Sequence, residues 1–212
     1  KALFDMSNIR EIPNEQNLGY IVGPRINAAG RLGNSNLGVE LLCANDDVNA
    51  NLLAEKLNRL NDERKDIQNK VLESAIDKIN NIDISSRNVI VLADEGWHEG
   101  VIGIIAGRIK DRFHKPTVII AINEDGIGKG SSRSVSGFDI GSAIIAAQQN
   151  EILITGGGHS MAAGLSLNKD KLELLDAFLN ERFSKTDMTN ARLKDYKIEV
   201  IINIIAANNK IV

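Results

Sequence analysis

Val89-Ile-Val-Leu-Ala93 and the segment Val101 to Phe113, which follows after one glycine-containing turn, decide the fold of this chain. The first is a run of five apolar residues, as in a buried β-strand, and the second has the apolar spacing of a helix. Pro116 to Ile122 predicts a second strand. Asn123 to Gly126 then predicts a hairpin turn that leads into a polar strand carrying Arg133.

The alternation of strands and helices continues downstream. Asp139 or Ser136 is placed to cap the next helix. Strands that alternate with helices, together with one hairpin, indicate an α/β fold in which helices flank a mixed β-sheet. The remaining elements are predicted in the order Phe138 to Gln148 (helix), Ile152 to Ile154 (strand), Gly164 to Leu167 (strand) and Lys169 to Phe183 (helix).

A long helix is predicted to precede this domain. Asp46 is placed as its N-cap, and its apolar residues recur at three-, four- and seven-residue steps with one five-residue slip. A helix of about 34 residues is about 50 Å long, so we expect a rigid connector packed along one stripe. Cys43 lies in an apolar run before the helix and is expected to be an inert core residue. The stripe consists of Leu53, Leu57, Leu60, Ile67, Val71, Ile76 and Ile79.

Bulk composition limits the possible functions. A net charge of −3 provides no global positive field, so nucleic-acid binding has to use a local cluster of cations. One cysteine excludes an internal disulfide and a cysteine-rich metal site. No apolar run approaches transmembrane length and no signal peptide is visible, so we expect a cytoplasmic protein without membrane contact. Because the sequence starts at Lys1 rather than at methionine, we expect a piece of a longer protein.

The most informative motif for function is Thr155-Gly-Gly-Gly-His-Ser-Met-Ala-Ala-Gly164. Consecutive glycines let a backbone approach a ligand closely, and consecutive N–H groups in a turn can form an anion-binding concavity. His159 adds a donor that can carry charge near neutral pH. The alternative is a flexible loop with a solvated histidine. Because small apolar residues follow and fix the loop between packed elements, the motif favours a phosphate or nucleotide site.

A second motif, Gly126-Ile-Gly-Lys-Gly-Ser-Ser-Arg-Ser134, combines glycine, hydroxyl and cationic side chains. It does not match the Walker A pattern. Its hydroxyl groups surround the planar guanidinium of Arg133, a combination that suits a terminal phosphate. The alternative is a polar strand whose arginine points into water.

The turn Asp94-Glu-Gly-Trp-His-Glu-Gly-Val-Ile-Gly103 admits two further interpretations. Its glycines lie between a strand and a helix, as in a dinucleotide-binding turn, with Glu124 as the ribose acid. The glycine spacing differs from that pattern, however, and Trp97 and His98 stand where a pyrophosphate would approach. The turn also contains aspartate, histidine and glutamate, which are metal-ligand types, but three mixed ligands on one turn rarely share a centre.

A third motif, Gly23-Pro-Arg-Ile-Asn-Ala-Ala-Gly-Arg-Leu-Gly33, sets Arg25, Asn27 and Arg31 in a frame of small residues. Such a frame lets a phosphodiester backbone come close to guanidinium donors. The alternative is a domain-core loop in which the arginines pair with buried carboxylates.

Four motifs occur in the order Gly23-Pro-Arg-Ile-Asn-Ala-Ala-Gly-Arg-Leu32, Gly96-Trp-His-Glu-Gly-Val-Ile-Gly-Ile-Ile-Ala-Gly-Arg108, Gly128-Lys-Gly-Ser-Ser-Arg-Ser134 and Gly156-Gly-Gly-His-Ser-Met-Ala-Ala-Gly164. Together they resemble the RecJ family of bacterial single-strand-specific DNA exonucleases, within the DHH phosphoesterase superfamily. They span most of the chain, so the resemblance is specific. The glycine-histidine motif alone is less specific, since it recurs in the DHH-associated domains of alanyl-tRNA synthetases and oligonucleotide phosphodiesterases.

The resemblance implies a two-domain catalytic core. An N-terminal DHH domain holds Mn²⁺ or Mg²⁺, a long helix crosses over, and the DHH-associated domain closes the cleft. This sequence contains no Asp-His-His triplet, so the resemblance implies that the metal-binding part is missing and that these residues hold no metal. The implied divisions are residues 1–45 (end of the DHH domain), 46–86 (connecting helix), 87–187 (DHH-associated domain) and 188–212 (start of an oligonucleotide-binding β domain, with a β segment over Tyr196 to Ile205).

The implied function is substrate binding in a metal-dependent 5′-to-3′ single-stranded DNA exonuclease, which releases mononucleotides in DNA repair and recombination. The implied partner is single-stranded DNA with a 5′-phosphate, and a helicase or a single-strand-binding protein is a candidate protein partner. Trp97 would stack on a base or, alternatively, be wedged in the domain interface. The implied site residues are Ser131 and Arg133 (terminal phosphate), His159 (catalytic, at the scissile phosphate) presented by Gly156, Gly157 and Gly158, and Arg25, Asn27 and Arg31 (strand backbone or domain junction).

Two alternatives stay open at the level of the sequence. One is an oligonucleotide or cyclic-dinucleotide phosphodiesterase of the same superfamily. The other is a non-catalytic module that binds nucleic acid or assists tRNA editing. A metal-binding DHH half ahead of Lys1 in the parent chain would favour a nuclease over the non-catalytic module.

Overall fold

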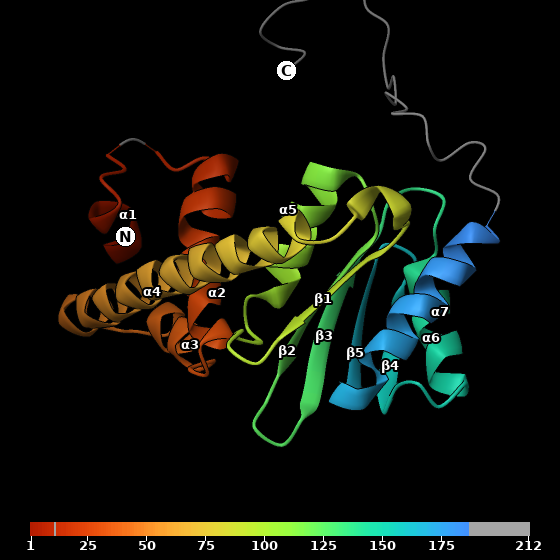
Figure 1. Ribbon diagram of the computed structural model, residues 1–212. Coiled ribbons are helices and arrows are strands. Elements are labelled where there is room, and N and C mark those ends of the chain that lie inside the picture. Colours follow the sequence, from red (N-terminus) through yellow and green to blue (C-terminus); the bar gives the residue numbers. More distant parts are fainter. Residues whose placement is uncertain (11, 187–212) are drawn as a thin grey trace, which may run out of the picture.

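The computed structural model describes residues 1–10 and 12–186, and Figure 1 shows their arrangement. A helical N-terminal part is connected by the long helix α4 (Asp47–Asn80) to a domain with a five-stranded sheet. The β segment expected over residues 196–205 lies outside the described residues. None of the helices within the described ranges is long and apolar enough to cross a lipid bilayer.

The N-terminal part consists of short helices packed against the first half of α4. They are α1 (Ala2–Met6), the π-helix Asn17–Val22, α2 (Gly23–Arg31) and α3 (Leu37–Leu42). Gly23 to Arg31 is therefore helical, and the alternative of a domain-core loop there is wrong. Pro24 lies in the first turn of α2, where its missing N–H costs nothing and its fixed φ suits a helix.

Helix α4 confirms the predicted connector. The Asp46 carboxylate caps it by accepting a hydrogen bond of 2.7 Å from the Asn49 N–H. Its buried stripe includes Leu57, Val71 and Ile79, as the apolar spacing predicts. The prediction for Cys43 is wrong, because its side chain is exposed. The short helix α3 turns it to solvent, so an apolar neighbourhood in the sequence did not become a buried one.

The sheet has the strand order β1-β2-β3-β5-β4. The first two strands are parallel and every other neighbouring pair is antiparallel, which confirms the mixed sheet. Because β5 is inserted between β3 and β4, strand β4 lies at the edge. The strands are β1 (Ile90–Asp94), β2 (Thr117–Ile122), β3 (Ile127–Arg133), β4 (Thr155–His159) and β5 (Ala162–Asn168).

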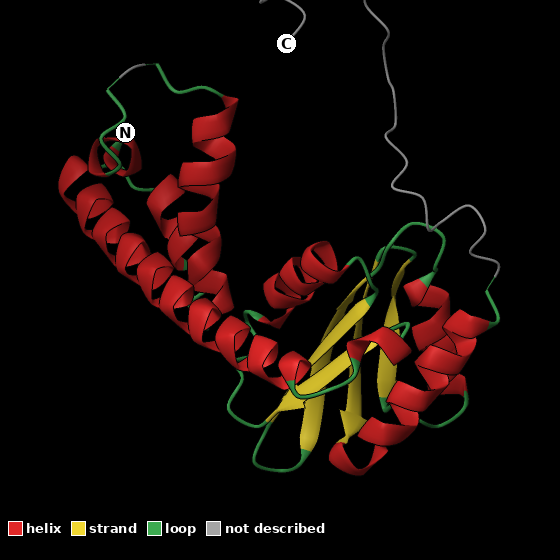
Figure 2. Cartoon of the chain, turned by 45° about the horizontal axis from the view of Figure 1, so that its top comes forward, coloured by secondary structure: helices red, strands yellow, loops and turns green. Residues whose placement is uncertain are grey.

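Helices cover the sheet on both faces (Figure 2). On one face, α5 (Ile102–Phe113) and the end of α4 pack over β1 and β2 around a core that contains Ile105, Ile119 and Trp97. On the other face lie α6 (Ile140–Gln149) and α7 (Leu172–Ser184). Two 3₁₀ turns, Ile84–Ser86 and Lys169–Lys171, complete the described elements. Asp139, one of the two residues that the sequence offers as a cap, is the residue that caps α6.

One predicted strand is absent, and the predicted glycine loop is itself a strand. Ile152 to Ile154 connects α6 to the sheet, and Ile152 and Leu153 are buried in the core beneath α6. The three glycines lie within β4, and the turn to β5 is made by Ser160 and Met161 instead. Pairing with β5 therefore outweighs the low strand propensity of glycine.

The contact between α4 and β1 carries a pH-dependent contribution to stability. Lys78 donates a hydrogen bond of 2.8 Å to the Asp94 carboxylate, and the Gly96 N–H donates another of 3.0 Å. These two donors, Lys78 first, lower the pKa of Asp94. The carboxylate is therefore stabilised in its ionised form by folding, and this stabilisation disappears as the pH falls through the pKa of the folded state.

We expect Asp94→Asn to lower the free energy of unfolding near neutral pH by about 1 kcal/mol, as for a partly exposed ion pair with one further hydrogen bond. The difference from the wild-type protein should narrow below about pH 4, where the carboxylate of the unfolded chain becomes protonated. Urea unfolding over a pH series measures both effects. Asp66→Asn, an exposed aspartate on α4, is the control. An unchanged difference at low pH would contradict the assignment.

Candidate functional site

The sheet has one polar face over β3, β5 and β4. The register puts the side chains of Arg133, Ala162 and His159 in one row across these strands. The next row contains Ser131, Gly164 and Gly157, and the third contains Lys129, Ser166 and Thr155. All nine positions are exposed or half-buried, whereas the alternate residues of β3 and β5 on the opposite face, such as Ser132, Leu165 and Leu167, are buried. The strand pairing thus collects hydroxyl, cationic and glycine positions on one accessible surface.

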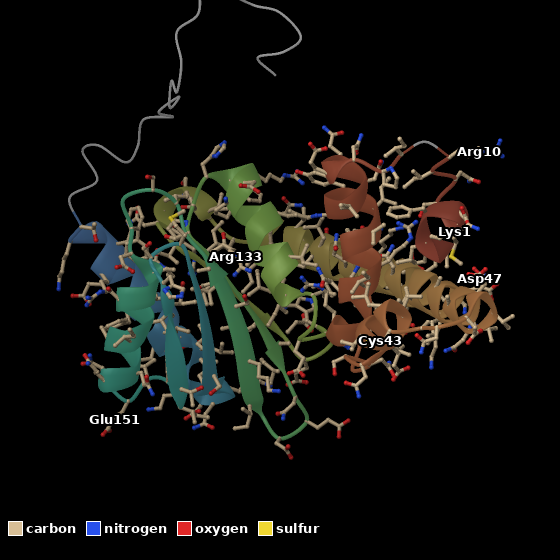
Figure 3. All side chains as sticks on the ribbon, turned by 180° about the vertical axis from the view of Figure 1, so that it is seen from behind. Lys1, Arg10, Cys43, Asp47, Arg133 and Glu151 are labelled. Carbon is tan, nitrogen blue, oxygen red and sulfur yellow. The ribbon has the colours of Figure 1, made fainter. Side chains whose placement is uncertain are left out.

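Arg133 is held at the border between this surface and α5, and Figure 3 shows it beside that helix. Its Nη1 donates hydrogen bonds to the Ser131 Oγ (3.2 Å) and to the Ser132 carbonyl (2.7 Å). No carboxylate pairs with it among the described residues. The guanidinium is therefore fixed in direction and keeps its charge available for an anion.

Gly103, in the first turn of α5, makes this arrangement possible. A Cβ there would lie 3.0 Å from the Ser131 Oγ and 3.3 Å from the Arg133 Nη2. The N-cap residue Val101 offers no side-chain hydrogen bond to the helix. The N-terminus of α5, with the positive end of the helix dipole, therefore lies next to Arg133 and Ser131. Such a combination is an anion-binding arrangement.

A cleft of about 840 Å³ joins this anion-binding arrangement to the N-terminal part of the chain. Arg31, at the end of α2, lines the cleft and donates a hydrogen bond of 3.2 Å to the Gly100 carbonyl. The two segments are in backbone contact, because a Cβ on Gly100 would lie only 2.0 Å from the Arg31 carbonyl oxygen. The structure thus brings Arg31, Ser131 and Arg133 together from positions up to 102 residues apart.

A second cavity, of about 790 Å³, lies next to the hairpin between β2 and β3. Its lining contains four carboxylates and two lysines, and each lysine is paired with one carboxylate at 2.5–2.6 Å, Lys169 with Glu95 and Lys129 with Glu99. An anionic ligand is repelled there, so the first cleft is the better candidate site. The acidic residues of this cavity are Glu95, Glu99, Glu124 and Asp125.

The three glycines of β4 have different surroundings. A Cβ on Gly156 would lie 2.7 Å from Ile144 of α6, and one on Gly158 would lie 2.4 Å from backbone atoms of Ala162 and Ala163. These two glycines are required by packing. A Cβ on Gly157 would meet nothing within 4 Å, because this residue belongs to the polar face. The substrate-binding role expected for the three glycines stays a prediction.

His159 ends β4 and is exposed. It does not line the cleft, but it lies in the row of Arg133, two strand spacings away, or about 10 Å. The expected catalytic role of His159 stays a prediction, and the structure places the residue on the face that carries the cleft.

Arg25 and Asn27 are not brought to the cleft. Arg25 donates to the Asn58 Oδ1 (2.9 Å) and to the Ile21 carbonyl (2.6 Å), so it stabilises the packing of the helical part. Asn27 is exposed on α2. The alternative that Arg25 and Arg31 pair with buried carboxylates is wrong, since the partners that the structure shows are an amide and carbonyl groups.

Trp97 is buried, with 7% of its surface exposed, and its Nε1 donates to the Ser74 Oγ on α4 (3.1 Å). The prediction that Trp97 is wedged in the interface between domains is therefore confirmed, and the prediction that it stacks on a base is wrong. Sequence reasoning missed Gly103 and Lys129 as cleft residues. The alternation of β3 carried a signal for Lys129, because it shares a face with Ser131 and Arg133.

The described residues do not fit a metal centre. No three His, Cys, Asp or Glu side chains within residues 1–10 and 12–186 are grouped as metal ligands. The cleft instead offers hydroxyl, guanidinium and backbone N–H groups, and its one carboxylate, Glu99, is paired with Lys129. Guanidinium and N–H groups bind anions and cannot coordinate Mg²⁺ or Mn²⁺.

The comparisons with known proteins agree with this geometry. Residues 86–185 match the DHHA1 domain. The single-stranded-DNA-specific exonuclease RecJ of Dickeya dadantii is 39% identical over 180 residues, which are 82% of this chain and 31% of the relative. The Bacillus subtilis RecJ is 37% identical over 169 residues, 79% of this chain and 21% of the relative.

A crystal structure of Thermus thermophilus RecJ in complex with Mg²⁺ matches with a TM-score of 0.74 and 27% identity, over 84% of this chain and 27% of that one. The chain thus spans about a third or less of the length of these relatives. Sequence and structure together show that the chain belongs to the RecJ family and contains its DHHA1 domain.

Proposed function

We propose that this chain is the substrate-binding part of a metal-dependent 5′-to-3′ single-stranded DNA exonuclease, which releases mononucleotides in DNA repair and recombination. The observation that carries the proposal is the cleft in which Arg133, Ser131, the N-terminus of α5 and Arg31 converge. A 5′-terminal phosphate is a dianion with three free oxygens, and these donors match its charge and its geometry.

In this proposal the terminal phosphate binds at Arg133 and Ser131. The strand then runs over the polar face, where Gly157 and Gly164 leave room for its backbone. His159, on the edge strand β4 at the end of the same row, contacts the scissile phosphate. The distance between Arg133 and His159 across the sheet fixes how many nucleotides lie between the bound end and the cleaved bond, which sets the length of the product.

The metal ions belong to residues other than those described. Thermus thermophilus RecJ structures contain Mg²⁺ or Mn²⁺. Since the described residues do not fit such a centre, we propose that another part of the same polypeptide holds the ions. When bound, the ions supply an activated water and charge stabilisation at phosphorus. Arg133, Ser131 and His159 supply the position of the substrate.

The proposed domain division keeps the boundaries that the family resemblance implies. Residues 1–45 end a preceding DHH domain, 46–86 connect, 87–187 are the DHH-associated domain, and 188–212 begin an oligonucleotide-binding domain. Large apolar side chains exposed on the N-terminal part and on the first turns of α4 support the first boundary, because a further domain would bury them. They are Leu18, Tyr20, Val39, Leu42, Val48 and Leu52.

We expect the 212-residue chain to release no mononucleotides from single-stranded DNA with Mn²⁺, and the full polypeptide that contains it to release them. The measurement follows oligonucleotides labelled at either end. Early release of the 5′ label as a mononucleotide establishes the polarity. Metal-dependent release by a pure preparation of the 212 residues contradicts the division of roles. If the full polypeptide hydrolyses dinucleotides and leaves longer strands intact, the result favours an oligonucleotide phosphodiesterase over an exonuclease.

A further inference from the structure

Three arginines lie on three helices that meet beside the cleft. Arg31 ends α2, Arg64 lies in the middle of α4, and Arg108 lies in α5. Helix α4 packs against both α2 and α5, so the helices that carry the three arginines share one junction. Arg31 also lines the cleft, so this arginine cluster continues the anion-binding surface that begins at Arg133.

The charges of the cluster are not neutralised within the described residues. None of its members forms an ion pair there. Burial and the positive charges of Arg31 and Arg108 lower the pKa of Arg64, against a weaker opposing effect of Asp62. That carboxylate is already occupied by Lys65 at 2.8 Å.

Arg64 is fixed in place by neutral groups. Its guanidinium donates to the Gln68 Oε1 (3.1 Å) and to the Asn61 Oδ1 (3.0 Å), and both of these side chains are buried. Its Nε is buried without a hydrogen-bond partner among the described residues. Arg64 is therefore a fixed cation without a carboxylate partner among the described residues, and its positive charge adds to that of the two exposed arginines in attracting an external anion.

The two exposed arginines belong to a repeated Ala-Gly-Arg triplet. Ala29-Gly30-Arg31 in α2 and Ala106-Gly107-Arg108 in α5 each contain a fully buried alanine, then a glycine, then an exposed arginine. A Cβ on either glycine would meet nothing within 4 Å, so helix packing does not require glycine there. Glycine costs a helix about 1 kcal/mol relative to alanine. The open space beside each of these glycines therefore lets a ligand approach the helix backbone closely.

We propose that Arg31, Arg64 and Arg108 form a second phosphate site, which holds a phosphodiester of the bound strand downstream of its 5′-terminal nucleotide. This site rests on the proposed function. A phosphodiester is a single anion flanked by bulky groups, and it suits two exposed guanidinium groups with open space beside each. The site lengthens the contact with the strand without involving the cleaved bond.

The test uses the full polypeptide and a 5′-phosphorylated oligothymidylate, with EDTA present so that binding is measured without cleavage. We expect Arg108→Gln to raise Kd about 3- to 10-fold near 0.1 M salt and to reduce the slope of log Kd against log salt by about 0.7. Arg182→Gln, an exposed arginine on the far helix α7, should change neither quantity. Gly107→Leu should raise Kd with an unchanged slope, because it fills the room and removes no charge.

A scan with uncharged methylphosphonate linkages locates the phosphate. Substitution of one particular internal phosphate by a methylphosphonate should raise the Kd of the wild-type protein. The same substitution should leave the Kd of Arg108→Gln unchanged. An unchanged Kd and slope for Arg108→Gln would overturn the second site while wild-type binding upholds the proposed function. Lower thermal stability with unchanged binding would also overturn it, since carboxylates elsewhere in the polypeptide would then neutralise the cluster. No binding by the wild-type protein would overturn the proposed function itself.

Discussion

Arg133→Ala in the full polypeptide is expected to lower kcat/KM on 5′-phosphorylated single strands by about 10- to 100-fold. The loss corresponds to one charge-assisted, bidentate contact to a dianion, about 1.5–3 kcal/mol. The Ser131 hydroxyl and the N-terminus of α5 remain in the variant, so binding of the terminal phosphate is weakened and not abolished. Initial rates of mononucleotide release at low substrate concentration give the measurement.

The same variant should lose much less on strands that end in a 5′-hydroxyl, because no terminal charge is left without a partner. His159→Ala is the comparison, since a group at the scissile phosphate is needed with either end. We expect His159→Ala to be impaired on both substrates to a similar extent. Equal impairment of Arg133→Ala on both ends would show that Arg133 does not recognise the terminal phosphate.

Gly158→Ala is expected to lower the free energy of unfolding by about 3 kcal/mol or more, as for overpacking against rigid neighbours. The added Cβ would lie 2.4 Å from the Ala162 carbonyl oxygen and from the Ala163 Cα, and backbone atoms of a paired strand cannot move aside. Thermal and urea unfolding of the described domain give the measurement.

Gly157→Ala is the matched control, one residue away on the same strand. Its Cβ points to the polar face and meets nothing within 4 Å, so stability should change by less than about 0.5 kcal/mol. If DNA lies on this face, Gly157→Ala should still weaken binding of single-stranded oligonucleotides. Comparable stability losses in both variants would show that the two faces of β4 are not distinct in the way described.

The sequence predicts the elements whose signals are local. The apolar run around Val91, the spacing in α4 and α5, and the capping aspartates Asp46 and Asp139 all gave correct elements. These signals depend on residues a few positions apart, so they survive without knowledge of the tertiary structure. The α/β class follows from them, and the structure confirms it.

The predictions that failed depended on distant partners. Strand β4 exists because β5 pairs with it and because Gly156 and Gly158 admit α6 and β5, and no local pattern in Thr155 to His159 contains that information. Cys43 was expected in the core from its apolar neighbours, but the fold leaves it exposed. The meeting of Arg31 with Arg133 likewise required the long helix to fold the chain back on itself. In the sequence these residues were separate candidates, and only the tertiary fold makes them one cleft.

The glycine-rich edge strand has a consequence for association between molecules through the edge of the sheet. An edge strand presents unpaired N–H and C=O groups, to which a strand of another molecule can add. One of the two edges of this sheet is β4, a strand of five residues with three glycines, one exposed threonine and one exposed histidine. Its low strand propensity and lack of apolar side chains offer an incoming strand little to bind beyond the backbone. The residues that leave room for packing and for a ligand thereby also make this edge a poor template for aggregation.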